Sequence, residues 1–154
     1  MADTREMFIN AQALLTVEGL PEYLQAAARM TAERGLYGLG AYMQALSDEQ
    51  LSALSQAMRL LGSEEAHQSE LTLLVLLLVN AEGSALRMSE STTPYLRKLY
   101  LLAQAEAFRR RGLVRLDYRK VSLLTFDPEM VEPTELARRQ GLSVRVEQKG
   151  RGNE

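Results

Sequence analysis

The chain has 154 residues, of which 46% are hydrophobic and 25% charged, so it is large enough for one globular domain with its own core. It has no cysteine, which excludes disulfides, thiolate catalysis and Cys-based zinc or iron–sulfur sites. This absence is compatible with a reducing cytoplasm, where we expect the protein to work. Residues 1–20 do not have the pattern of a signal peptide.

Helical spacing of apolar residues runs through the first two-thirds of the chain. It predicts helices over residues 3–16 and about 21–34, and a third that follows the capping box Ser47–Gln50 and ends before Gly62. A further helix starts near Ser63 and holds the apolar run 71–79 (LTLLVLLLV). Nine helical residues span about 14 Å, too short for a bilayer core of about 30 Å. We therefore expect this run to lie at the centre of the core, and we expect no membrane partner.

The next helix carries apolar residues on two faces. Residues 82–93 are small and polar and are predicted to form a loop, after which Thr93-Pro94 begins a helix over about 94–111. Its second apolar face includes Leu101 and Phe108. Because exposed apolar surface usually marks an interface, these two residues are candidate contacts of a homodimer.

The periodicity changes after Gly112. The runs 113–117, 121–126 and 142–147 are β-rich and are predicted to form one antiparallel or mixed sheet, with Asp117 at the first position of a turn. Residues 127–134 are predicted as a loop, about 134–140 as a short helix, and 148–154 as a flexible tail. The predicted fold is mainly α: a single domain over 1–147 with five to six helices and a small C-terminal β-hairpin or sheet within 113–147.

The sequence offers no catalytic or cofactor-binding constellation. His67 is the single histidine and has Glu-x-x-His spacing with Glu64, but di-iron bundles need a second such motif. The glycine-rich stretch GLYGLG at 35–40 has the wrong order for a dinucleotide-binding loop and is predicted to connect two helices flexibly. We therefore expect no enzyme, no cofactor and no metal site.

Charge is unevenly distributed along the chain. Residues 1–96 contain five Lys/Arg against twelve Asp/Glu, whereas residues 97–154 contain thirteen against eight. Three interpretations stay open for the basic third: ordinary solvated charge, a nucleic-acid face, or a surface for an acidic protein such as the acidic half of another copy. The candidate residues for binding nucleic acid or an acidic partner are Arg109, Arg110, Arg115, Arg119 and Lys120.

Residues 91–126 resemble the recognition helix and wing of winged-helix DNA-binding domains. In that family the helix ends in a Gly-Leu-Val or Gly-Leu-Ile step, and a hairpin with a basic tip follows. The residues that carry the resemblance are the step Gly112-Leu113-Val114, the tip residues Arg119 and Lys120, and Leu124-Thr125 of the returning strand. The resemblance implies that the tip contacts the phosphate backbone of DNA.

The segregated charge and the two-faced helix favour a protein that works by binding a macromolecule. Our first hypothesis is a non-enzymatic helical interaction module that binds a protein partner and self-associates, most simply as a homodimer. The alternative is a winged-helix-like transcriptional regulator that binds DNA through the basic segment 109–120.

Overall fold

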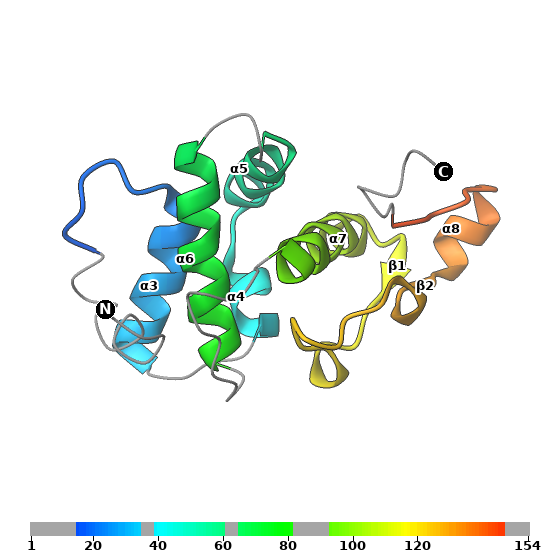
Figure 1. The fold of residues 1–154 in the computed structure, drawn as a ribbon. Coiled ribbons are helices and arrows are strands. Elements are labelled where there is room, and N and C mark those ends of the chain that lie inside the picture. The colour runs from blue at the N-terminus through cyan, green and yellow to red at the C-terminus, as the bar shows by residue number, and fades with distance from the viewer. Residues whose placement is uncertain (1–14, 35–38, 61–64, 82–92, 147–154) are drawn as a thin grey trace.

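The computed structural model of the chain describes residues 15–34, 39–60, 65–81 and 93–146, with elements numbered as in Figure 1. This part is mainly helical and contains one two-stranded antiparallel sheet near its C-terminal end, which confirms the predicted fold class. The α-helices are α3 (Glu22–Arg34), α4 (Leu39–Ala45), α5 (Asp48–Arg59), α6 (Glu65–Ala81), α7 (Thr93–Arg110) and α8 (Glu135–Arg139). The remaining elements are the strands β1 (Val114–Arg115) and β2 (Glu132–Pro133) and the 3-10 helices η1 (Tyr118–Lys120) and η2 (Pro128–Met130).

The apolar run 71–79 lies within α6 at the centre of the core. Leu71 and every residue from Leu74 to Val79 are buried. Helix α6 packs against α3, α5 and α7, and Figure 1 shows α3 and α6 side by side, with α7 between them and the C-terminal segment. Because each helix from α3 to α7 contributes buried residues to one cluster that includes this run, its predicted position is confirmed.

Local sequence signals explain where helix α5 begins and where helix α7 ends. The Ser47 hydroxyl accepts a hydrogen bond from the Gln50 N–H at 3.0 Å, and the Gln50 side chain accepts one from the Ser47 N–H at 2.8 Å, so the predicted capping box is present. Helix α7 ends at Arg110, and Gly112 two residues later has a left-handed φ of 76°. The Leu113 N–H then donates to the Phe108 carbonyl at 3.0 Å, a glycine-dependent cap that directs the chain into β1.

The sheet is not composed of the predicted strands. β1 lies in the predicted run 113–117, but its partner β2 lies in the segment 127–134 that the sequence predicts as a loop. Val114 pairs with Pro133 and Arg115 with Glu132. A proline is tolerated here because a two-stranded sheet leaves the outer edge of each strand unpaired. The assignment of 121–126 and 142–147 to this sheet was therefore wrong, since neither 121–126 nor 142–146 is a strand.

Residues 121–126 contain a turn at 123–125, whose backbone groups bind side chains instead of a neighbouring strand. The Ser122 hydroxyl accepts hydrogen bonds from the N–H groups of Leu124 and Thr125 at 3.2 and 3.1 Å. The ammonium group of Lys98 in α7 donates to the Leu124 carbonyl. Side chains of the run instead enter the core, namely Val121, Leu123 and Phe126. A run of residues with high β-propensity can thus place side chains in the core without pairing with another strand.

The remaining predictions have mixed outcomes. The helices at 21–34, 94–111 and 134–140 are confirmed as α3, α7 and α8, and the turn at Asp117 is present, whereas helix α4 was not predicted. Residues 3–14 of the predicted first helix, residues 82–92 of the loop and the tail 148–154 lie outside the described residues, and the single domain stays a prediction. Among the described helices, none has the length and apolar character needed to span a membrane.

Candidate functional site

Two of the candidate cations are bound to a buried carboxylate of their own helix. The Glu106 side chain is 0% exposed. Arg109 donates from Nε to Oε1 at 2.8 Å and from Nη2 to Oε2 at 3.0 Å, and Arg110 donates from Nε to Oε2 at 2.7 Å. The hydroxyl of Tyr118 in η1 also donates to Oε1. We call these four residues the Glu106 clamp.

The clamp keeps Glu106 ionised. Burial by itself raises the pKa of this carboxyl group, but the hydrogen bonds from Arg109, Tyr118 and Arg110 lower it by more, so its pKa lies below the usual value. Burial, and then the nearby carboxylate, raise the pKa of the Tyr118 hydroxyl. At neutral pH Tyr118 is therefore a protonated donor and Glu106 an ionised acceptor, so the clamp is a fixed structural unit at that pH.

Arg110 also links α7 to α4 and α5. Its Nη2 donates to the Met43 carbonyl in the last turn of α4 at 2.9 Å. Its Nη1 donates to the Asp48 carboxylate in the first turn of α5, also at 2.9 Å. A cation at a helix C-terminus and an acid at a helix N-terminus are both favourable placements. Arg110 thus holds three helices together, and its side chain is committed to this structural role.

Tyr118 is held in place by close contact with α4. A Cβ atom added at Gly40 would lie 2.6 Å from Cβ of Tyr118, so the contact requires a glycine. The Arg109 guanidinium lies 5.7 Å from the centroid of the Tyr118 ring, a cation–π distance. Gly40 is the last glycine of the stretch GLYGLG, and its role in the structure is to let η1 pack against α4.

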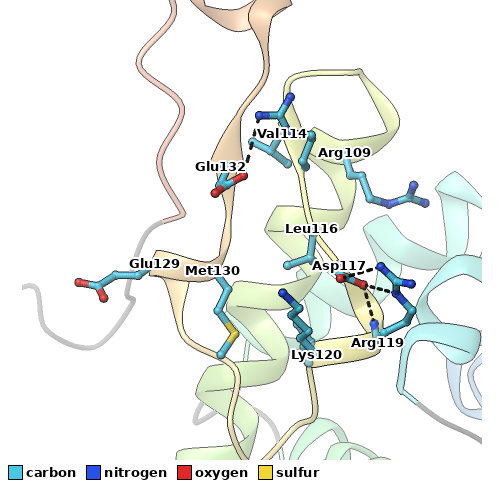
Figure 2. Close-up of a pocket in the computed structure, with 11 residues that line it drawn as sticks. Arg109, Val114, Leu116, Asp117, Arg119, Lys120, Glu129, Met130 and Glu132 are labelled. Carbon is cyan, nitrogen blue, oxygen red and sulfur yellow. Dashed lines mark hydrogen bonds and ion pairs between the residues drawn. The ribbon is translucent and has the colours of Figure 1, made fainter.

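A groove of about 820 Å³ lies beside the clamp, between the β1–η1 segment and the η2–β2 segment (Figure 2). Figure 2 shows the side chains of Leu116, Lys120 and Met130 pointing into the space between the two segments, whereas Glu129 points away. We call this the C-terminal groove. Its lining residues are Arg109, Val114, Arg115, Leu116, Asp117, Arg119, Lys120, Val121, Glu129, Met130 and Glu132.

Most cations of the C-terminal groove are next to a carboxylate. Arg119, whose side chain is 90% exposed, donates to both oxygens of Asp117 at 3.0 and 3.2 Å. Arg115 lies 3.8 Å from Glu132, and Arg109 belongs to the clamp. The exposed Lys120 forms no ion pair with a carboxylate of the described residues. The pKa of Asp117 is lowered first by its hydrogen bonds with Arg119, and the charge of Lys120 makes a smaller contribution. The groove therefore carries little excess positive charge.

The structure brings four of the five predicted cations to this groove and places Arg110 inside the fold instead. The candidate interface residues lie elsewhere: Leu101 is 3% exposed within the chain, and Phe108 is half-buried. Leu101 thus has almost no free surface to offer a second copy. Large apolar side chains that are exposed in the C-terminal segment are Met130, Leu136 and Leu142.

The sequence analysis missed Glu106 and Tyr118 as parts of the site. The spacing of Glu106 to Arg109 and Arg110 is i+3 and i+4, which places all three on one face of a predicted helix and was a usable signal. Within the described residues there is no cluster of three His, Cys, Asp or Glu side chains that could hold a metal ion. His67 is in α6, and its side chain lies outside the described part.

Comparisons with protein-family models, with curated proteins and with solved structures give no match to this chain. Its function is therefore inferred from its own geometry.

Proposed function

We propose that this protein is a non-enzymatic interaction module that binds a protein partner at the C-terminal groove. The observation that carries the proposal is the lining of this groove, which combines apolar side chains with charges of both signs. Protein interfaces combine an apolar centre with a polar rim in this way. A polyanion such as DNA would instead favour a surface on which most cations are unpaired.

The exposed apolar side chains support the same function. Met130 lines the groove and is 38% exposed, and Leu136 and Leu142 follow within the next twelve residues of the chain. An exposed apolar side chain in a groove offers an anchor point that a partner can cover, as Met130 does here. The helical core on the other side of α7 then acts as a scaffold that holds this segment in place.

Site-specific photocrosslinking tests the proposal. A benzoylphenylalanine residue in place of Met130 should give adducts in an extract of the source organism, and those adducts should survive nuclease treatment. The control carries the same group in place of the exposed Arg29 of α3, a helix that Figure 1 shows on the opposite side of α7 from β1 and β2. Adducts that vanish with nuclease, or equal labelling from both positions, would refute a protein-binding groove.

The alternative, a DNA-binding regulator, is favoured by one observation. Arg119 and Lys120 are both exposed in η1, where the resemblance to winged-helix domains places the DNA-contacting tip. An anisotropy titration with mixed-sequence duplex at two salt concentrations separates the two functions. Nanomolar binding that falls steeply with salt and weakens when both residues become alanine would establish the alternative.

Self-association is part of the proposal and has its own test. The exposed apolar side chains of Leu136 and Leu142, which do not line the groove, are the contacts that a second copy would cover. Light scattering at tens of micromolar should report a dimer, and Leu142→Ser should weaken it. If light scattering reports a monomer at that concentration, self-association is refuted, and the proposed function is reduced to binding a different protein.

A further inference from the structure

The side chains that point into the C-terminal groove carry one sign of charge. Lys120 points into the space between the two segments, and Glu129 points away from it (Figure 2). Asp117 and Arg119 are turned toward each other, and Glu132 lies beside Arg115 at the end where the strands pair. Four cations line the groove, and three of them, Arg109, Arg115 and Arg119, are within 4 Å of a carboxylate. Lys120 is the fourth, so the complement of the groove carries one negative charge.

Apolar side chains share the groove with this ammonium. Leu116 and Met130 point into the same space, and Val114 and Val121 are the other apolar residues of the lining. Lys120 is exposed, so an ion pair with it alone would contribute little, and contacts with the apolar side chains must supply part of the affinity. The complement of this site is thus an anionic group flanked by apolar side chains, and a bare anion would not use the apolar contacts.

The groove walls combine short extended stretches with the 3-10 helices η1 and η2. Asp117 has φ −92° and ψ 99°, and Val131 has φ −95° and ψ 121°, which are both extended conformations. The two segments pair at Val114–Pro133 and Arg115–Glu132 and separate beyond that point. A volume of about 820 Å³ is within the range of roughly 300–1,000 Å³ found for ligand sites. An extended peptide lying along the walls matches this shape.

We propose that the C-terminal groove binds an extended peptide segment in which an acidic side chain is flanked by apolar residues. The acidic side chain pairs with Lys120, and the apolar residues contact Leu116, Val121 and Met130. The inference rests on the proposed function and specifies its ligand class. The Glu106 clamp contributes by fixing Tyr118, so that Lys120 two residues later has a defined position.

Selection from a random peptide library displayed on phage tests the inference. Peptides enriched on the wild-type protein should contain an acidic residue next to apolar residues. In fluorescence titrations, Lys120→Glu should weaken the best peptide about tenfold or more, because attraction becomes repulsion. Changing the acidic residue of that peptide to lysine should restore its binding to Lys120→Glu. Met130→Ser should weaken the binding of the best peptide to the otherwise wild-type protein and of the lysine-bearing peptide to Lys120→Glu, because it removes an apolar contact.

Arg97→Glu is the matched control, since Arg97 is also exposed and the change in net charge is the same. Its affinity for the peptide should equal that of the wild type, and circular dichroism should show all variants folded. Three results would overturn the inference. They are a selection that enriches no peptide, enriched peptides that show no preference for an acidic residue, and an equal loss of peptide affinity in Lys120→Glu and Arg97→Glu. Displacement of the peptide by duplex DNA at physiological salt would overturn it as well. In each of the first three cases, nuclease-resistant adducts at Met130 would still support a protein-binding groove. The failure of the peptide inference can therefore be distinguished from the failure of the proposed function.

Discussion

Replacing Glu106 with glutamine should destabilise the protein, because Arg109 loses the carboxylate that it binds and Arg110 loses one of the two that it binds. The carboxylate accepts four hydrogen bonds, two from Arg109 and one each from Arg110 and Tyr118. A glutamine has one acceptor oxygen, and its amide nitrogen would face donors wherever it points. The best orientation directs the nitrogen toward Tyr118, whose hydroxyl can rotate to accept, and still loses the bond from Arg109 Nε.

The expected loss follows from the burial of each partner. Removing one member of a buried ion pair costs about 3–5 kcal/mol. Glu106 is 0% exposed, but the side chains of Arg109 and Arg110 are 33% and 20% exposed, so water compensates part of the loss. We therefore expect about 3 kcal/mol, which for a chain of this size corresponds to a decrease in Tm of roughly 6–12 °C. Urea unfolding followed by circular dichroism measures this difference directly.

Glu129→Gln is the control, because it makes the same chemical change at an exposed carboxylate that points away from the groove. It should leave the urea midpoint unchanged, and equal shifts in the two variants would refute the role of the clamp. The pKa of Glu106 is lowered on folding, so its stabilisation is complete above the unfolded pKa of about 4.3 and is lost as the pH falls through the folded value. The difference between wild type and Glu106→Gln should therefore shrink in acid.

Three further predictions concern stability, each measured by urea unfolding. Gly40→Ala should cost about 1–3 kcal/mol, because the new Cβ would lie 2.6 Å from Cβ of Tyr118; an unchanged midpoint would show that η1 shifts freely. Tyr118→Phe should cost about 1.5–3 kcal/mol by removing a hydrogen bond to a carboxylate, and much less in the Glu106→Gln background; equal costs in both would contradict the coupling. Ser47→Ala should cost about 1 kcal/mol through loss of the capping box, whereas Ser52→Ala within α5 should not; similar effects of the two would argue against the cap.

Features that depend on neighbouring residues were predictable from the sequence. The capping box at Ser47, the start of α7 at Thr93-Pro94 and its end before Gly112 are local, because a few adjacent residues satisfy the free backbone groups of a helix end. The central position of the run 71–79 follows from composition, since a stretch apolar on every face can be covered only inside the protein.

Features that depend on residues far apart in the chain were not predictable. The pairing of Val114 with Pro133 is fixed by the path of the chain between them, and the apolar pattern of 121–126 cannot show that Lys98 of α7 occupies the Leu124 carbonyl. The alternation at 142–146 has the pattern of a strand, but a strand also needs a partner strand alongside it, which the alternation does not specify. The need for a glycine at position 40 could not be predicted either, because it comes from the close approach of Tyr118, which lies far away in the sequence.

The position of Glu106 determines what the three consecutive arginines of the chain do. Arg109 and Arg110 lie three and four residues after it on α7 and turn to it, whereas Arg111 remains exposed. Counting charges along the sequence therefore overestimates the basic surface by these two residues. The consequence is measurable, because each phosphate neutralised on duplex DNA adds about −0.9 to the slope of log affinity against log salt. If duplex DNA contacts the groove through Lys120 alone, its affinity should have a shallow slope against salt. A slope several times larger would mean that Arg115 and Arg119 leave their carboxylates to bind the DNA.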